Sequence, residues 1–537
     1  MGVALNADER PVSHDFAIAL TSMPPLLELK EKSVGNLKSY ASALRDQLKN
    51  VKNALQQMKK LRSHSKTQSD SYTSNVFYQY RLTRHMHQDW PKWLKLMAKK
   101  LGAKQIASAQ SLHPLLPTET DLSEALLAIY RLQTTYKLKA KDMVAGILKG
   151  KYYSHDKWGV IECSMLGLFY FYKERYTYAI DWLKLALKLY KHSNAKLIKI
   201  MDWTFVAILE ILVEATRISG RYKAAYIYAN RTLARKPNDD YMKRQVEQLK
   251  ELSQLPLVPN VERNSNKLYK KFCNRPYPPI VKGVSCHYLR STPFLKLAPI
   301  KMEVLSQDPS ITYYHGLLSD VEASTLKNLS RPLLHRAEFF DFKTNLYAMD
   351  YYGQRTCKTA RLDDHVHEVT EALNQRVSHV TGLLLTDSEK LQIINYGMSG
   401  HIHEHIDASK RSSEGEWETG DRTATALAYL TDVEQGGETV FPLLNITVVP
   451  RKGSVMVFYN LQLNSQADER TLHVSCPIIF GDKWIATKWI RDKAQMFIRP
   501  CPIHFKPLPK SDLLPEMEVT NDLDFIREED YAGSLMK

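Results

Sequence analysis

Apolar residues in the N-terminal half of the chain recur mostly at steps of three and four, the spacing of one face of an α-helix. Between residues 34 and 58 these steps alternate strictly, as they do along the seam of a coiled coil. The seam consists of Val34, Leu37, Ala41, Leu44, Leu48, Val51, Leu55 and Met58. The pattern predicts either a helix that self-associates through these residues or an amphipathic helix that packs on its own domain.

Residues 120–240 are also helical in pattern and contain a weak internal repeat, with copies at 166–186 and 212–237. The spacing of small and aromatic residues matches the tetratricopeptide repeat, in which small residues let paired helices touch. Aromatic residues crowd the first copy, where they either build the core or line a groove for a proline-rich peptide. Tyrosine suits the groove because its ring stacks on proline while its hydroxyl tolerates water. The tyrosines expected to contact such a peptide are Tyr170, Tyr176 and Tyr178.

After a proline-containing linker over residues 252–285, the pattern changes to short β-type runs separated by turn signals. The predicted strands are Leu391–Tyr396, His401–Asp407, Ala424–Leu430, Thr439–Phe441, Ser454–Tyr459, His473–Phe480 and Trp484–Trp489. Many short strands of this kind favour a double-stranded β-helix, also called a jelly roll.

With 537 residues the chain is too long for a single core, and we expect a multidomain α + β protein. The predicted regions are an N-terminal helical, coiled-coil dimerisation region (1–120), a tetratricopeptide-like α-helical domain that binds peptide (121–250), a linker (251–300), a jelly-roll domain (301–505) and an acidic tail (506–537).

The net charge of +16 comes mostly from the region before residue 260. A basic face can attract nucleic acid, but no nucleic-acid-binding motif is visible, and we interpret these charges as solvated helix faces. No apolar stretch reaches the ~18–20 residues that a membrane span needs. The apolar runs of the first twenty residues are too short for a signal peptide. Either the protein is not secreted, or its leader lies outside this sequence.

Six cysteines are present and none forms a C-x-x-C zinc pattern. Two pairs are close in sequence, Cys273 with Cys286 and Cys476 with Cys501. Disulfides within these pairs would close short loops in an oxidising compartment, whereas buried reduced thiols are the alternative. Sequons compatible with glycosylation in a secretory compartment begin at Asn230, Asn328 and Asn445.

The strongest chemical signal is the run His401-Ile402-His403-Glu404-His405-Ile406-Asp407. Alternate residues of a strand share a face, so His405 and Asp407 point the same way, and His401 and His403 would share that face. With His473 from a later strand they can form a 2-His-1-carboxylate triad, which leaves positions on Fe(II) for a co-substrate and O2.

Two other metal-site classes do not fit this run. A metallo-β-lactamase-like hydrolase would need a histidine after Asp407, and a cupin would need a glutamate shortly after His405; neither is present. We therefore expect His405, Asp407 and His473 to bind the metal. The extra histidines are expected beside it at the mouth of the barrel, because a facial triad needs no third histidine.

Lys483 follows Gly481-Asp482 and precedes Trp484, so it enters an apolar strand rather than a charged surface. A 2-oxoglutarate co-substrate chelates iron through its 2-oxo acid end, and its far carboxylate needs a cation. A lysine serves as a compact point charge for such an anion. Tyr396 and Tyr429, each in a strand predicted to face inward, could add hydroxyl hydrogen bonds.

These residues lie within a longer pattern of motifs. Its members are Asn395-Tyr396-Gly397, His405-Ile406-Asp407, Gly436-Gly437-Glu438-Thr439-Val440-Phe441-Pro442, Lys452-Gly453, Tyr459-Asn460-Leu461, His473, Cys476-Pro477, Gly481-Asp482-Lys483-Trp484 and Lys488-Trp489. The pattern resembles the catalytic domain of the alpha subunit of animal collagen-type prolyl 4-hydroxylases. The order of the predicted regions resembles that family across nearly the whole chain.

The resemblance implies a procollagen-proline 4-dioxygenase that uses Fe(II), 2-oxoglutarate, O2 and L-ascorbate to hydroxylate proline in X-Pro-Gly sequences. It also implies a tetramer in the endoplasmic reticulum lumen, in which protein disulfide isomerase forms the beta subunits and supplies the retention signal. It further implies disulfides Cys273–Cys286 and Cys476–Cys501.

Two alternative functions remain open at this point. Tyrosines expected on the inner helix of the second repeat are replaced by Ile211 and Glu214, which favours a hydroxylase of a proline-containing peptide other than collagen. The other alternative is a non-catalytic subunit for peptide binding or assembly. A missing metal ligand would be the sign of such a subunit, and none is missing.

Overall fold

A computed structural model describes residues 13–63, 102–153, 158–254, 268–275, 285–341, 346–349, 354–408 and 419–503, together with residues 84, 86, 92, 93 and 95. The predicted acidic tail and parts of the predicted linker lie outside the described residues. The chain forms two compact units, one of Met1–Thr21 with Glu119–Lys537 and the other of Ser22–Thr118. None of the helices that the structure describes is long and apolar enough to cross a membrane.

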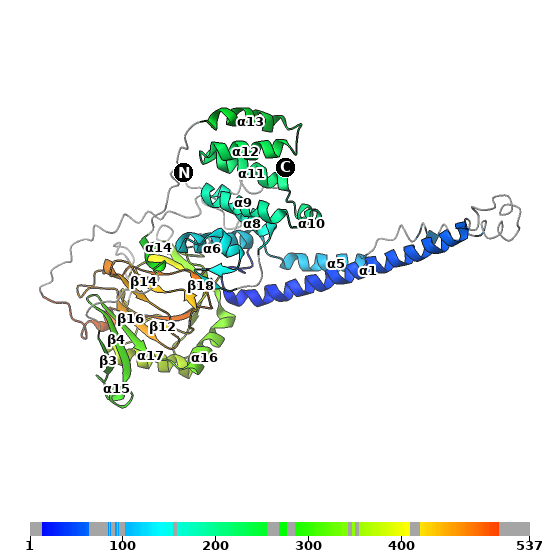
Figure 1. The fold of residues 1–537 in the computed structure, drawn as a ribbon. Coiled ribbons are helices and arrows are strands. Elements are labelled where there is room, and N and C mark those ends of the chain that lie inside the picture. Colours follow the sequence, from blue (N-terminus) through cyan, green and yellow to red (C-terminus); the bar gives the residue numbers. More distant parts are fainter. Residues whose placement is uncertain are drawn as a thin grey trace, which may run out of the picture. The chain divides into compact units, whose positions relative to one another are not determined.

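The smaller unit is built on α1 (Met23–Ser63), beside which α5 (Ala103–Leu112) packs (Figure 1). The Asn36 side chain on α1 donates a hydrogen bond of 2.7 Å to the Gln105 carbonyl on α5. The helix predicted over residues 34–58 is therefore confirmed. Its seam stays open to solvent, because Leu37 is 66% and Leu48 53% exposed.

The larger unit begins with a stack of helices (Figure 1). They are α6 (Glu119–Tyr136), α7 (Ala140–Val144), α8 (Val160–Tyr172), α9 (Tyr176–Tyr190), α10 (Ala195–Ile200), α11 (Phe205–Ile218), α12 (Tyr222–Leu233), α13 (Asp240–Leu252) and α14 (Leu268–Cys273). Helices α8 and α9 pack as one pair, and α11 and α12 as the next. Gly167 lets α8 approach α9, because a Cβ there would collide with the Leu183 side chain. Thr204 caps α11 by accepting a hydrogen bond from the Ala207 amide.

Apart from β1 and β2, which form a small hairpin between α7 and α8, the strands of this unit lie in its C-terminal part, where short helices accompany the antiparallel sheets. The strands are β1 (Ile147–Leu148), β2 (Lys151–Tyr152), β3 (Cys286–Leu289), β4 (Ile300–Gln307), β5 (Ser310–His315), β6 (His335–Arg336), β7 (Glu338–Asp341), β8 (Leu346–Met349), β9 (Cys357–Leu362), β10 (Leu391–Tyr396), β11 (Ile402–His405), β12 (Arg422–Tyr429), β13 (Gln435–Gly436), β14 (Thr439–Phe441), β15 (Ile446–Val448), β16 (Val455–Tyr459), β17 (His473–Ser475), β18 (Ile478–Phe480) and β19 (Trp484–Arg491). The helices are α15 (Pro293–Leu297), α16 (Asp320–Ser330) and α17 (Glu368–Thr381).

Two of these sheets face each other across a core. Within the described residues, the larger has nine strands in the order β3-β4-β5-β16-β12-β19-β10-β9-β6 and the smaller has four in the order β11-β17-β14-β15. Strand β12 shows how alternation builds both faces: Leu427 and Tyr429 point into the core between the sheets, whereas Ala426 packs on the face that α16 and α17 cover.

The helical stack and the sheets share a continuous core within this unit. Val440 on β14 and Val474 on β17 pack into the same cluster as the residues of α6, α8 and α9. The Tyr136 hydroxyl at the end of α6 donates a 2.5 Å hydrogen bond to the Pro477 carbonyl. The outer face of the smaller sheet is therefore covered by helices rather than by solvent.

The disulfide pairing differs from the one that the resemblance implied. Cys273 bonds to Cys476, with 5.7 Å between their Cα atoms, so the expected pairs Cys273–Cys286 and Cys476–Cys501 are not formed. Cys286 and Cys501 are exposed free thiols in this structure. The reason is the position of α14, which lies against β14 and places Cys273 beside the loop that follows β17. The bonded cysteines are 203 positions apart, so closeness in sequence did not predict the pairing.

The predicted sequons lie at different depths. Asn328 on α16 and Asn445 between β14 and β15 are exposed, and Arg275 contacts the Asn445 side chain. Asn230 on α12 is half-buried, and its amide donates to the Tyr226 carbonyl at 2.9 Å. Glycosylation at these three positions stays a prediction.

Candidate metal centre

Three predicted ligands meet at one end of the smaller sheet. His405 on β11 pairs directly with His473 on β17, and their ring centroids are 4.2 Å apart. The Nε2 atom of His405 lies 3.4 Å, and that of His473 4.0 Å, from Oδ1 of Asp407. One donor atom from each residue lies within 4.8 Å of the others. The structure thus brings together the three residues that the sequence predicted.

The other two histidines of the run do not join this group. A β-bulge between Ile402 and His405 makes three steps on β11 match two on β17. Ile402 and His405 therefore share a face, and the strict alternation that placed His403 on the same face was wrong. His403 packs edge-on against Tyr269 at 5.8 Å. His401 is buried, and its Nδ1 lies 3.3 Å from the Thr356 hydroxyl.

The backbone orients both ligand histidines in the same way. Nδ1 of His405 lies 2.8 Å from the His403 carbonyl, and Nδ1 of His473 lies 3.1 Å from the Thr471 carbonyl. A carbonyl can only accept, so each Nδ1 carries a proton, and Nε2 is the ring nitrogen that faces Asp407. Two imidazoles and one carboxylate with this orientation fit a divalent iron.

Asp407 is held by residues that the sequence analysis did not single out. Its Oδ2 accepts hydrogen bonds from the Thr425 hydroxyl at 2.7 Å and from Trp489 Nε1 at 3.0 Å. Thr425 on β12 and Trp489 on β19 are direct partners in the larger sheet, so their side chains point the same way. Asn460 continues this network by donating to Thr425 at 2.8 Å. Trp489 is part of the Lys488-Trp489 motif, but only the pairing of β12 with β19 shows that its indole N–H donates to Asp407.

Electrostatics favour the protonation states that a metal needs. Burial raises the pKa of Asp407, but His473, His405 and Arg422 outweigh burial and hold that pKa well below its usual range. Burial, helped by the charge on His405, lowers the pKa of His473 to about 4, although Asp407 acts in the opposite direction. At neutral pH the site therefore offers an ionised carboxylate and a neutral His473.

Lys483 is buried beside the metal group, with 1% of its surface exposed. Its ammonium donates to the Gly437 carbonyl at 2.6 Å and to the Ser475 hydroxyl at 2.8 Å, and it lies 4.8 Å from the centre of the Tyr396 ring. Among the described residues no carboxylate forms an ion pair with it. Burial lowers the pKa of Lys483 to about 7, with Glu438 opposing that change. A buried ammonium without an anion is costly, and a carboxylate ligand would relieve that cost.

The two tyrosines predicted beside Lys483 differ in their surroundings. Tyr396 and Tyr429 are both buried in the core between the two sheets, so the inward orientation of their strands is confirmed. Burial raises the pKa of both hydroxyls, which keeps them protonated hydrogen-bond donors. The Tyr429 hydroxyl already lies 2.9 Å from the Thr439 hydroxyl.

The three tyrosines predicted to bind a peptide do not share one environment. Tyr170 is fully buried, and its hydroxyl donates to Gln133 on α6 at 2.6 Å, so it belongs to the core of the helical stack. Its placement in the groove was wrong, because Gln133 satisfies the hydroxyl inside the core. Tyr176 and Tyr178 are half-buried, and Tyr178 stacks on Tyr170 with 5.2 Å between ring centres.

Two family models match the chain. Residues 19–150 match the N-terminal region of the prolyl 4-hydroxylase alpha subunit, and residues 391–491 match the 2OG-Fe(II) oxygenase superfamily. A prolyl 4-hydroxylase subunit alpha-2 of Caenorhabditis elegans is 29% identical over 513 residues, covering 91% of this chain and 93% of that protein. The human subunit alpha-1 is 27% identical over 517 residues, covering 90% of this chain and 95% of that protein.

Among solved structures, a viral collagen prolyl hydroxylase of Paramecium Bursaria Chlorella virus-1 in complex with 2OG is 24% identical, with a TM-score of 0.28. It covers 34% of this chain and 95% of its own. The relatives in sequence, by contrast, extend over both the helical region and the sheets. Over most of its length the chain is therefore similar to prolyl 4-hydroxylase alpha subunits, and it is a 2-oxoglutarate-dependent dioxygenase.

Proposed function

We propose that this dioxygenase 4-hydroxylates proline in collagen-like peptides, with Fe(II) bound by His405, Asp407 and His473. The observation that carries the proposal is the shared orientation of the two histidines. Each uses its Nδ1 proton on a backbone carbonyl and turns Nε2 toward Asp407. Next to this group lies the buried ammonium of Lys483, which a carboxylate ligand would neutralise. Bound iron, with 2-oxoglutarate and O2, supplies the oxidation of a C–H bond.

The side chains of this chain provide binding, orientation and exclusion of water. Thr425 and Trp489 hold one oxygen of Asp407, which leaves the other for the metal. Lys483 binds the far carboxylate of 2-oxoglutarate in place of its present contacts with Gly437 and Ser475. Tyr396 and Tyr429 add hydroxyl groups, and the apolar rings of Phe441 and Phe458 beside His473 keep bulk water away.

We propose that the paired helices α8–α9 and α11–α12 are tetratricopeptide repeats that hold the peptide, and that the two facing sheets form a jelly roll. Tyr176 and Tyr178 remain the candidate peptide contacts, since both are half-buried tyrosines in the first turn of α9. The names of the relatives support proline as the target residue.

The remaining parts of the proposal concern the setting of the enzyme. We place it in the endoplasmic reticulum lumen with protein disulfide isomerase as a beta subunit and with L-ascorbate as a reductant. The Cys273–Cys476 disulfide supports an oxidising compartment. The exposed leucines of α1 support self-association through a coiled coil.

One observation favours a proline-containing peptide other than collagen. Glu214 on α11 receives a 2.7 Å hydrogen bond from Arg217 and a 3.0 Å hydrogen bond from the Tyr241 hydroxyl on α13. Ile211, the second altered position, packs against the core of the helical stack. The second repeat therefore presents a charged, hydrogen-bonded surface where tyrosines were expected.

An assay of the full-length chain with two peptides separates these functions. We expect succinate formation coupled to hydroxyproline with a collagen-like Pro-Pro-Gly peptide, and less with a proline-rich peptide that lacks glycine. The His405→Ala variant should lose this turnover with either peptide, because it removes one metal ligand. A matched control is His365→Ala, since His365 is an exposed side chain paired with Glu371. Preference for the second peptide would overturn collagen as the substrate, and full turnover in His405→Ala would overturn the metal assignment.

A further inference from the structure

A short N-terminal segment, residues 13–21, belongs to the unit that contains the sheets rather than to the unit that begins at Ser22. We call this segment the strap. Its middle residues Ala17, Ile18 and Ala19 are buried although they precede the first long helix in the chain. A terminal segment this deeply buried needs partners that fix it, and it has them at both ends.

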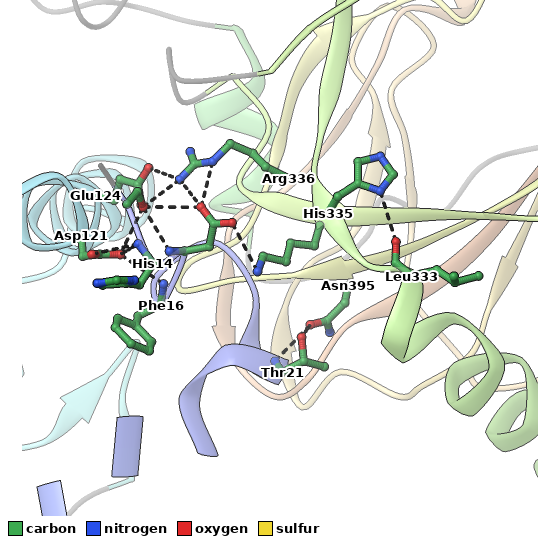
Figure 2. A network of polar contacts seen from close by, with 12 residues as sticks. His14, Phe16, Thr21, Asp121, Glu124, Leu333, His335, Arg336 and Asn395 are labelled. Carbon is green, nitrogen blue, oxygen red and sulfur yellow. Dashed lines mark hydrogen bonds and ion pairs between the residues drawn. The ribbon is translucent and has the colours of Figure 1, made fainter. Parts of the chain in front are cut away.

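At its first end the strap is tied to α6 and to the larger sheet (Figure 2). The Asp121 carboxylate on α6 accepts hydrogen bonds from the amides of His14 at 3.1 Å and Phe16 at 3.3 Å. The Asp15 carboxylate accepts from Arg336 on β6 at 2.6 Å and lies 3.3 Å from the Lys358 ammonium on β9. These are charge-assisted contacts with buried or half-buried partners, so they hold the strap firmly.

At its second end the strap lies on the turn after β10. The Met398 amide donates to the Ala17 carbonyl at 2.8 Å. Gly397 allows this approach, because a Cβ there would collide with the carbonyls of Ala17 and Ile18. This turn leads directly to His401 and then to β11, which carries His405.

The last strap residue reaches a buried amide (Figure 2). Both the backbone amide and the hydroxyl of Thr21 donate to Oδ1 of Asn395, each at 3.2 Å. Asn395 is 0% exposed, and its own amide donates to the Asp482 carboxylate at 2.9 Å. Loss of the Thr21 hydroxyl would remove one of these two hydrogen bonds and leave only the backbone amide as a donor from the strap to the buried Asn395 carbonyl.

The two residues linked in this way are the chain neighbours of the proposed co-substrate residues. Asn395 precedes Tyr396, and Asp482 precedes Lys483. The Tyr396 amide donates to the Lys483 carbonyl at 3.1 Å, so the two backbones are also bonded to each other. A displacement of Asn395 would therefore also displace Tyr396 and Lys483, the two side chains proposed to bind 2-oxoglutarate.

We propose that the strap is a positioning element for 2-oxoglutarate, with Thr21 acting through Asn395 on Tyr396 and Lys483. This inference rests on the proposed function, because it assigns the strap to the co-substrate half of that site. The hydrogen bonds given above join the strap to α6, to the larger sheet and to the turn after β10, and none of them involves a proposed metal ligand, Tyr176 or Tyr178. Loss of the strap should therefore weaken binding of 2-oxoglutarate more than binding of metal or peptide.

The test uses the full-length chain with Asp15→Asn and Thr21→Val together, which remove one charge and one hydroxyl without changing the side-chain size. We expect the dissociation constant for 2-oxoglutarate, measured by calorimetry with Mn(II) in place of iron, to rise about fivefold, the equivalent of one typical hydrogen bond. The KM for peptide should stay within about twofold. Thr21→Ser keeps the hydroxyl and should bind 2-oxoglutarate like the parent chain.

The matched control carries the same two kinds of substitution on α16, Asp320→Asn and Thr325→Val, where Asp320 is exposed and Thr325 half-buried. Unchanged affinity for 2-oxoglutarate in the strap variant would overturn the inference. So would an equal loss of 2-oxoglutarate, metal and peptide binding, which indicates a merely structural role. If the double variant does not fold, Thr21→Val alone decides the same comparison. A parent chain that binds no 2-oxoglutarate would overturn the proposed function itself, and this inference with it.

Discussion

At the scale of single residues, the second oxygen of Asp407 shows how the larger sheet supports the metal-binding strands. Trp489 donates its indole N–H to this oxygen, and the Arg422 guanidinium lies 3.7 Å from the centre of the Trp489 ring. A phenylalanine would keep the ring under Arg422 and remove only the N–H. A substitution at Trp489 can therefore remove the hydrogen bond to the metal ligand Asp407 while keeping the packing against Arg422.

We expect Trp489→Phe to weaken metal binding about tenfold, since partners that orient a ligand typically contribute ~10–100-fold in affinity. Titration of the full-length chain with Mn(II) measures the effect. Trp203→Phe in the helical stack is the control, because Trp203 is equally buried and far in sequence from the site. Equal affinities in both variants and the parent chain would contradict this role of Trp489.

The second prediction at this scale concerns Lys483 and pH. Burial lowers its pKa to about 7, so the free enzyme loses the ammonium as the pH rises through neutrality. A bound carboxylate favours the ammonium, so 2-oxoglutarate affinity should be highest below about pH 7 and fall by up to about tenfold per pH unit above it. Calorimetric titration of the Mn(II)-loaded protein between about pH 6 and pH 9 checks the sign of this slope.

Lys483→Arg provides the comparison for this pH profile. A guanidinium stays charged throughout that range, so the variant should bind 2-oxoglutarate more weakly but with little change above neutral pH. A parent chain whose affinity is as flat as that of the variant would show that Lys483 stays charged in the free enzyme.

The residues of the site divide according to what sequence spacing can reveal. His405 and Asp407 are two positions apart, and Lys483 stands out as a charge entering an apolar strand, so local patterns identified them. Thr425 and Trp489 reach Asp407 across 18 and 82 positions of the chain, and only the pairing of β12 with β19 aligns them. Hydrogen-bonding roles that depend on strand partners are not encoded in a local pattern.

At the scale of elements, the strands were predictable where alternation was regular. Strands β10 and β14 have the predicted ends. The predicted strand His473–Phe480 is instead divided into β17 and β18, because Pro477 has no amide proton for a ladder. The bulge in β11 was likewise invisible in the spacing, since it depends on the register against β17.

The disulfide is the clearest prediction at this scale. Cys273 on α14 and Cys476 after β17 join two elements that are 203 positions apart in sequence. Proteolysis of the non-reduced protein followed by mass spectrometry should therefore yield a linked peptide that contains both residues. Cys286 and Cys501 should be alkylated without prior reduction, because both thiols are free and exposed.

Linked peptides Cys273–Cys286 and Cys476–Cys501 would contradict this connectivity. The Cys273→Ser variant adds a second measurement. It should lower the midpoint of urea unfolding, since closing so long a loop typically contributes ~2–5 kcal/mol. Cys163→Ser serves as the control, because Cys163 is buried in the same core but forms no disulfide.

At the scale of the whole molecule, the order of helical and β regions followed from the change in hydrophobic period near residue 300. The division into compact units did not, because the helical stack and the sheets share one core through Val440 and Val474. Neither valine carries a local sign that its outer neighbour is a helix. The strap shows the same limit, since its hydrogen bonds to Asp121 and Asn395 span between 105 and 374 positions of the chain.

The smaller unit supports the last prediction, which concerns the number of copies in the assembly. On α1, Asn36 faces α5 through its hydrogen bond to Gln105, whereas the leucines at the neighbouring positions stay exposed. An exposed apolar seam with a heptad repeat is typical of a helix that meets a second copy of itself. We therefore expect the full-length chain to sediment with two copies per particle.

Charges placed in this seam should separate the copies. Leu37→Glu with Leu44→Glu puts two carboxylates where the partner helix would lie, and burying them unpaired would cost several kcal/mol. The variant should sediment with one copy per particle while its turnover per chain stays unchanged. Ser39→Glu with Ser42→Glu adds the same charges on exposed positions away from the seam and should remain paired. Two copies in the leucine variant, or separation in the serine variant, would show that α1 is not the contact between them.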